Sequence, residues 1–336
     1  MDPDPHALHE LLSLYYLKFD LSEYPTDQEI ETLRYETKYL LASFYPIRLV
    51  SCLVEYHVLQ YNSTKVGVYY MKNNQIHNWE NSNQPFILYF HGGEFAFGNI
   101  DIDTYSGYEC HLSKYQNMLI VHVEIRQVYQ FLFNVDFNIH QRLIGMSDAS
   151  GGMLWIYLLQ WIVSNNKPVP QGVVLHSPWS HLDFTEENLY DYRDNILSVQ
   201  LALNLRKIAL GKTTYWFELT NEQVKKINQK RNAFEGFPPL YIHVTAGTNE
   251  ILILIGEIRR MVKKINLASG QVILDEGIGL MHTYALFHMW IFKGKCVRQN
   301  IRKWIHVILP MHVRSTLNMA EIETNSQNIR KPGLCT

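Results

Sequence analysis

Cysteine is scarce in this chain, with four among 336 residues, and the four lie far apart at Cys52, Cys110, Cys296 and Cys335. No two of them form a C-x-x-C pair. Structural zinc sites and small disulfide-rich scaffolds need closely or regularly spaced cysteines. We therefore expect neither a zinc site nor a disulfide framework.

Long apolar runs are also missing. The run ILILIG at 251–256 is far shorter than the ~20 residues that cross a bilayer. The opening MDPDPHALHELL lacks the basic and apolar segments of a secretory signal. Asn62-Ser63-Thr64 matches a glycosylation sequon, but such triplets arise often by chance. We expect a soluble, cytoplasmic protein with no integral membrane segment.

A basic surplus is absent as well. The formal net charge is −2, and the richest basic run, VKKINQKR at 224–231, is typical of a solvated helix face. Recognition of phosphate backbones needs clustered positive charge, which argues against nucleic acid as a partner. No G-x-G-x-x-G follows a first strand and no His/Cys cluster has ligand spacing, so we expect no nucleotide cofactor and no metal.

What the sequence does contain is a hydrophobic fraction of 47%, distributed in short β-rich runs between helical segments. Several runs are continuous rather than alternating, as in strands buried on both faces of a parallel sheet. This pattern predicts an α/β fold with a mostly parallel, doubly wound sheet. The first 45 residues indicate two helices, one of them opened by a capping box of Thr26 and Glu29. The predicted strands are 65–70, 85–90, 117–124, 142–147, 171–176, 239–245 and 270–276.

The ends of these strands carry the candidate chemistry, because open α/β sheets bind ligands at their carboxyl edge. His91-Gly92-Gly93 directly follows the predicted strand 85–90. Consecutive glycines let the backbone come close to a ligand and leave N–H groups free to point at an oxyanion. The motif predicts an oxyanion-binding turn, although an ordinary glycine turn would have the same letters.

The stretch RLIGMSDASGGMLWIYLL, residues 142–159, predicts a buried strand, a sharp turn and an apolar helix. This is the layout of a nucleophile elbow. Two registers compete for it. One makes Ser147 the nucleophile, flanked by Gly145 and Ala149, but it leaves a very short strand. The other uses Gly151 and the glycine after it to start the helix and places Ala149 at the tip. We favour the second register because it gives a strand of normal length.

Two further residues complete the pattern. Glu250 follows the predicted strand 239–245, and His282 follows the last predicted strand, 270–276. Alone, Glu250 could charge the first turn of a helix, and His282 is one of 15 histidines. The order of elbow, acid and histidine along the chain is that of α/β-hydrolases.

Together these segments resemble the hormone-sensitive-lipase-type family of α/β-hydrolase esterases. HGGEFAFG is similar to the family's HGGGF block and SDASGGML to its GDSAGGNL elbow. HSPWSHL, FPPLYIHVTAGTNEIL and GLMHTYALF are similar to its later blocks, in the same order, so that the resemblance runs from about Val66 to Phe287. It implies an α/β-hydrolase fold with an N-terminal helical cap.

The resemblance also implies a role for each matching residue. Gly92, Gly93 and the Ser150 amide would form the oxyanion hole. Glu250 would be the acid and His282 the general base. The nucleophile position falls on Ala149, so in that register no hydroxyl is available to attack. Loss of the nucleophile in triad hydrolases costs on the order of a million-fold in turnover.

The chain departs from the family pattern at two more places. Glu94 stands where the third glycine of the HGGGF block is expected. Only residues 127–141 separate Arg126 from the elbow strand, where the family has a longer helical crossover. A parallel crossover needs at least ~10–12 residues, so the strands can connect, but through a shortened helix.

Two functions stay open at this point. One is a serine esterase that uses Ser147 or Ser150, with His282 and Glu250. The other is a non-catalytic relative that binds a small ester or apolar ligand in the same pocket. Aromatic residues near the site suggest an apolar pocket or simple core packing, namely Phe95, Phe97, Tyr284 and Phe287.

The expected organisation has three parts. We expect a helical cap at 1–48, an α/β-hydrolase domain at 49–312 and a disordered tail at 313–336. For the assembly, a homodimer is the arrangement to be tested.

Overall fold

The structure is a computed structural model, and it describes single residues between 26 and 36, then 45–61, 64–73, 83–93, 103–123, 139–180, 240–250 and 252–317. Most of the expected cap, Glu94, Phe95, Phe97 and nearly all of the shortened segment after Arg126 lie outside the described residues. Thr26 and Glu29 are described and form the predicted capping box. The Glu29 N–H donates to Thr26 Oγ1 (3.2 Å), and the Thr26 N–H donates to Glu29 Oε2 (2.7 Å).

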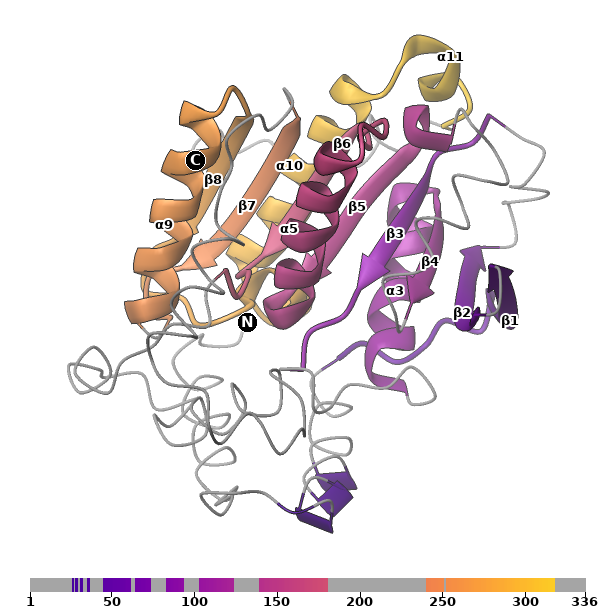
Figure 1. The fold of residues 1–336 in the computed structure, drawn as a ribbon. Helices are drawn as coiled ribbons and strands as arrows, with labels where there is room; N and C mark the ends of the chain where they lie inside the picture. The colour runs from indigo at the N-terminus through magenta and orange to yellow at the C-terminus, as the bar shows by residue number, and fades with distance from the viewer. Residues whose placement is uncertain are drawn as a thin grey trace, which may run out of the picture.

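The described elements build one eight-stranded sheet with the order β1-β2-β4-β3-β5-β6-β7-β8 (Figure 1). β1 pairs with β2 and β2 with β4 in antiparallel fashion, and all other neighbours are parallel. The predicted mostly parallel α/β sheet is therefore confirmed. The strands are β1 (Cys52–Tyr61), β2 (Thr64–Asn73), β3 (Phe86–Phe90), β4 (Leu119–Val123), β5 (Leu143–Asp148), β6 (Gly172–His176), β7 (Tyr241–Gly247) and β8 (Gln271–Gly277).

All seven predicted strands are present, and the sequence pattern missed only β1 among the described strands. β1 lies at the edge of the sheet and pairs with β2 alone. Leu53, Tyr56 and Val58 on β1 are exposed, so apolar side chains in this strand do not mark a buried face. An edge strand of this kind has neither the continuous apolar run nor the clean alternation that reveals inner strands.

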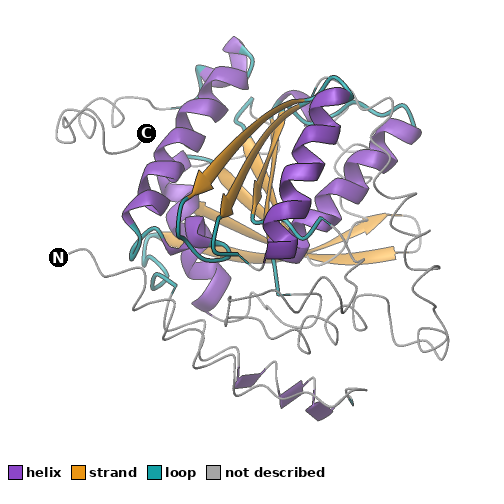
Figure 2. Ribbon diagram, turned by 90° about the vertical axis from the view of Figure 1, so that its left-hand side faces the viewer, coloured by secondary structure: helices purple, strands orange, loops and turns teal. Residues whose placement is uncertain are grey.

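Helices cover both faces of the sheet (Figures 1 and 2). α3 (Asp103–Gln116) and α10 (Phe292–Ile308) pack on one face, and α5 (Ala149–Ser164) and α9 (Leu252–Leu267) pack on the other. The short elements are the 3₁₀ turns η2 (Ile139–Gln141) and η4 (Tyr284–Phe287) and the helix α11 (Met311–Arg314). Within the described part of the chain, no helix is long and apolar enough to cross a membrane.

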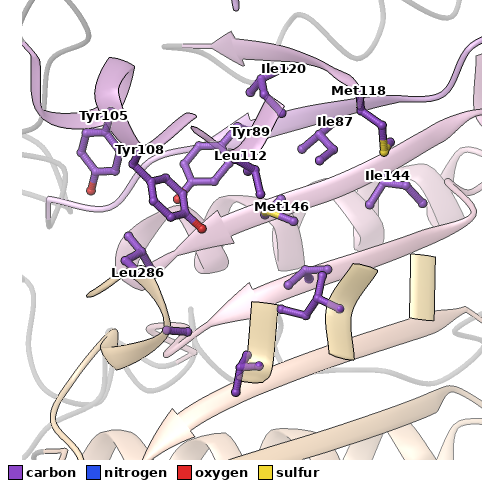
Figure 3. Packing of buried hydrophobic residues seen from close by; sticks show 14 of the residues in the cluster. Ile87, Tyr89, Tyr105, Tyr108, Leu112, Met118, Ile120, Ile144, Met146 and Leu286 are labelled. Atoms are coloured by element: carbon purple, nitrogen blue, oxygen red, sulfur yellow. The ribbon is translucent and has the colours of Figure 1, made fainter. Parts of the chain in front are cut away.

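The core forms two apolar layers, one on each side of the sheet. Residues alternate between them along each inner strand, so that Ile87 and Tyr89 of β3 face α3 and α10, while Leu88 faces α5 and α9. Figure 3 shows the first layer, where the Tyr89 and Tyr108 rings are neighbours with 6.1 Å between their centroids. Because both faces are covered, β3, β4, β5 and β6 are buried along their whole length.

A disulfide corrects one expectation from the sequence. Cys52 of β1 and Cys110 of α3 are bonded, with 5.7 Å between their Cα atoms and 58 positions between them in sequence. Cys296 is also disulfide-bonded, and none of the described cysteines is a free thiol. Spacing along the chain failed as a guide because pairing depends on distance in the folded structure.

Candidate active site

The turn between β5 and α5 falls at Ala149, the register that we favoured. β5 ends at Asp148 and α5 begins at Ala149, which has a φ of 42°. This left-handed backbone conformation costs a residue with a Cβ roughly 1–2 kcal/mol. Such a cost is typical of functional turns whose surroundings fix the backbone. The elbow geometry is therefore present, with a methyl group at its tip.

The two glycines after Ser150 make this turn sterically feasible. A Cβ on Gly151 would overlap the backbone oxygens of Phe90 and His91, and one on Gly152 would lie 2.5 Å from Pro178 Cβ. The helix start thus packs directly against the loops that follow β3 and β6. The Trp179 N–H, from the β6 loop, donates to the Ala149 carbonyl oxygen (2.8 Å).

Ser147 lies on the opposite side of the sheet from Asp148. Side chains alternate along β5, so Ser147 shares its face with Gly145, where an added Cβ would lie 2.7 Å from the Trp155 ring of α5. Ser147 is fully buried, and its Oγ has no hydrogen-bond partner among the described residues. Its hydroxyl therefore lies in the layer beneath α5. Ser150 is fully buried in the first turn of α5.

Asp148 is the centre of a buried hydrogen-bond network. Its Oδ1 accepts from the Tyr89 hydroxyl (2.7 Å) and the Gly92 N–H (3.0 Å), and its Oδ2 accepts from the Tyr105 hydroxyl (2.9 Å). Burial raises the pKa of this carboxyl group, and the three hydrogen bonds oppose that rise. The network ties the turn after β3 to the elbow.

The same network involves one of the amides expected in the oxyanion hole. The Gly92 amide has one hydrogen and donates it to Asp148, so it is not available to an oxyanion in this structure. Gly93, with a φ of 101°, and the Ser150 amide remain as candidate donors. The turn is still close to the elbow, because a Cβ on Gly92 would lie 3.1 Å from Ala149 Cβ.

Glu250 and His282 meet although 32 positions separate them in the sequence. The distance between His282 Nδ1 and Glu250 Oε2 is 3.1 Å. Glu250 is fully buried, and its other oxygen, Oε1, accepts from the Gly247 N–H (2.6 Å) and from the Ser177 hydroxyl. The carboxylate is thus held from both sides. The pairing that the sequence predicted from strand-end positions is present.

Ser177 is a site residue that sequence reasoning missed. Besides donating to Glu250, its Oγ accepts from the Thr283 N–H (2.8 Å), next to His282. Its backbone has a φ of 45°, and its N–H donates to the Thr245 carbonyl oxygen (2.7 Å). The only sequence signal was its position in HSPW, directly after a buried strand. Asp148 was missed for a similar reason, since its partners come from β3 and α3.

A second buried cluster lies behind the turn after β3. His91 Nδ1 is 2.5 Å from the Gly92 carbonyl oxygen, and the His91 ring stacks on His122 with 5.1 Å between centroids. His122 Nδ1 is in turn 2.5 Å from Glu109 Oε1, and both of these side chains are fully buried. Burial lowers the pKa of His91 to about 4, so that its ring is neutral at physiological pH. In the described part of the chain, no group of histidines, cysteines and acidic residues could hold a metal ion.

Comparison with known proteins agrees with this architecture. No protein-family model matches the chain. An esterase from Acinetobacter venetianus is 21% identical over 224 residues, which are 62% of this chain and 70% of that protein.

Solved structures give the stronger similarity. A hormone-sensitive lipase from a metagenome library matches with a TM-score of 0.70 and 17% identity, over 92% of this chain and 100% of that one. An esterase/lipase from an uncultured bacterium matches with a TM-score of 0.69 and 16% identity, over 92% and 99%. An esterase of the bacterial hormone-sensitive lipase family matches with a TM-score of 0.68 and 16% identity, over 92% and 100%.

These similarities define the class of fold. The chain has the α/β-hydrolase fold of esterases and lipases. The resemblance that the sequence motifs indicated is confirmed at this level.

Proposed function

We propose that this chain binds a carboxylic ester in an esterase-type site that has lost its nucleophilic hydroxyl. The observation that carries the proposal is Ala149 in the left-handed turn between β5 and α5, the position of an elbow nucleophile. The acid–histidine pair, Glu250 and His282, is intact. An ester that binds here meets no serine at the tip and forms no acyl-enzyme.

A serine esterase that uses Ser147 or Ser150 is the competing function. Ser147 has its hydroxyl in the layer beneath α5, so attack on an ester would require the strand to rotate. Ser150 follows the tip, where the backbone amide rather than the side chain serves an oxyanion. The geometry favours the ester-binding function over this alternative.

The class of ligand is inferred from the proteins that share this fold. The proposed partner is a small or medium carboxylic ester, or an apolar ligand of similar shape, because the similar proteins include an esterase and a hormone-sensitive lipase. Tyr284 and Phe287 do not help to define it, because both are buried in the core layer beneath α3 and α10.

Hydrolysis of p-nitrophenyl butyrate tests the proposal. The parent chain, Ala149→Ser and the double variant Ala149→Ser with His282→Ala are compared. Restoring the hydroxyl should raise kcat at least about 100-fold above the parent, and removing His282 should abolish the gain. Parent activity equal to that of Ala149→Ser, and lost in Ser147→Ala or Ser150→Ala, would contradict the proposal.

We also propose that the chain folds in an oxidising compartment rather than in the cytoplasm. The sequence predicted a cytoplasmic protein without a disulfide framework, whereas Cys52 and Cys110 are bonded and Cys296 is oxidised as well. Persistent disulfides are rare in the cytosol of mesophiles. When the protein is extracted from its own cells into a buffer with an alkylating reagent, Cys52 and Cys110 should stay unlabelled, because the reagent modifies only free thiols. Full labelling of both thiols would support the cytoplasm.

A further inference from the structure

We infer that the Glu250–His282 pair activates a water molecule directly, so that the site hydrolyses activated esters slowly without a covalent intermediate. The inference rests on the proposed function, since it requires an ester bound beside Ala149. In this role the pair acts as a general base on water and needs no serine.

The contact with Glu250 determines which nitrogen of the neutral His282 ring carries the hydrogen. Glu250 Oε1 is occupied by the Gly247 N–H and the Ser177 hydroxyl, and Oε2 lies 3.1 Å from His282 Nδ1. A buried carboxylate held in this way accepts the Nδ1–H and fixes the neutral tautomer with its lone pair on Nε2. His282 is thereby prepared as a general base, whatever molecule gives up the proton.

His282 has no serine at the tip of the elbow to deprotonate. In a triad, the serine hydroxyl is the proton donor to Nε2. Ala149 removes that donor, whereas the left-handed turn at the elbow and the Glu250–His282 pair are both present. Once an ester is bound as proposed, water is the nucleophile that remains, and positioned general bases accelerate such attack by about 10²–10⁴-fold.

Ser177 holds the Glu250–His282 pair in place. Its Oγ links the Glu250 carboxylate to the backbone N–H of Thr283, the residue after His282. Ser177 is fully buried, and its φ of 45° shows that its surroundings fix this backbone. We assign it as a positioning residue, because it acts on the reacting atoms only through Glu250 and the histidine loop.

The proposed step balances without a co-reactant other than water. The water oxygen bonds to the ester carbonyl carbon while His282 Nε2 takes one of its protons. The carbonyl π electrons move onto the oxygen, for which the Gly93 and Ser150 amides are the candidate donors. The C–O bond to the alcohol then breaks, and the leaving oxygen takes the proton back from Nε2. The products are a carboxylic acid and an alcohol.

The experiment measures p-nitrophenyl acetate hydrolysis by the parent, His282→Gln, Ser177→Ala and the matched control His312→Gln, whose histidine is exposed on α11. We expect a parent rate above buffer with no burst. His282→Gln should lower it about 100-fold, Ser177→Ala should shift the acid limb of its pH profile, and the control should change nothing. Circular dichroism checks that each variant is folded.

Two outcomes separate this inference from the proposed function. Binding of a trifluoromethyl ketone, whose hydrate mimics the tetrahedral intermediate, is measured by calorimetry on the parent. If the ketone binds but the parent rate equals that of His282→Gln, water activation is wrong and ester binding stands. If neither binding nor hydrolysis occurs, or if intact mass shows an acetyl adduct on the parent, the proposed function itself fails.

Discussion

At the scale of single residues, the site is held together by buried polar atoms rather than by sequence neighbours. Asp148 joins β5 to β3 and α3 through three hydrogen bonds, and Ser177 joins Glu250 to Thr283. A buried polar group without such partners costs about 1–3 kcal/mol, so each of these contacts also fixes the backbone around it. The consequence is an elbow that stays strained at Ala149 without a catalytic side chain.

His243 of β7 supplies a pH test at this scale. It is buried beside the Trp304 ring, its ring nitrogens have no hydrogen-bond partner among the described residues, and burial lowers its pKa to about 4. An unfolded histidine titrates near 6.5. Between these values the unfolded chain binds more protons, so the folded state is fully stabilised above about pH 6.5 and loses up to about 3 kcal/mol by pH 4.

We therefore expect His243→Leu to flatten the pH dependence of the free energy of unfolding. Relative to the parent, the variant should gain stability as the pH falls from 7 to 4, as measured by urea unfolding at several pH values. His312→Leu, which changes an exposed histidine, serves as the control. If the free energy of unfolding depended on pH in the same way for His243→Leu and for the parent, His243 would not be a neutral buried histidine.

At the scale of elements, the position of the elbow depends on how closely α5 packs on β5. Gly145 of β5 lies against the Trp155 ring, and the Trp155 Nε1–H donates to the Met146 carbonyl oxygen (3.0 Å). These contacts determine how far the first turn of α5 stands from the end of the strand. The location of Ala149 is thus a property of the strand–helix pair.

Gly145→Ala tests this packing. Its Cβ would lie 2.7 Å from the Trp155 ring, and we expect a loss of about 1–3 kcal/mol in the free energy of unfolding. The matched control is Gly256→Ala in α9, where an added Cβ meets nothing within 4 Å. Replacing that helical glycine should stabilise the protein by roughly 0.5–1 kcal/mol. Chemical denaturation should show that the two variants change the free energy of unfolding in opposite directions. Equal changes in both variants would contradict the close packing of Gly145 on Trp155.

The bond between β1 and α3 gives a second test at this scale. In the chain-entropy description, a bond that closes a loop of 58 residues raises the free energy of the unfolded chain by about 4 kcal/mol and so stabilises the fold. Cys52→Ser, Cys110→Ser and the double variant should each lose a similar amount in thermal or urea unfolding, because all three remove one bond. Additive losses in the double variant would show that the two thiols act separately.

At the scale of the whole molecule, the sequence predicted the sheet well because its inner strands are covered on both faces. Continuous apolar runs such as the one in β3 arise from that burial, and the positions of strand ends then placed Glu250 and His282 at one edge. The sequence did not predict the edge strand β1 or the Cys52–Cys110 bond. Nor did it predict the hydrogen bond from the Gly92 amide to Asp148. Each depends on which elements become neighbours in space, and spacing along the chain does not encode that.

Several larger-scale expectations stay predictions. The boundaries at residues 48 and 312 of the proposed cap and hydrolase domain are among them, and so is a homodimer as the assembly. Both boundaries lie within described residues, and α11 (Met311–Arg314) crosses the one at 312, so that residues 313 and 314 are helical rather than part of a disordered tail. Sedimentation of the purified full chain would decide whether it forms a homodimer.

The most direct test of the central claim, that Ala149 occupies an otherwise intact nucleophile position, is the intact mass after treatment with a fluorophosphonate. The account predicts no adduct on the parent, one adduct on Ala149→Ser at the new serine, and none on Ala149→Ser with His282→Ala. An adduct on the parent at Ser147 or Ser150 would contradict it, as would an unreactive Ala149→Ser variant that is folded.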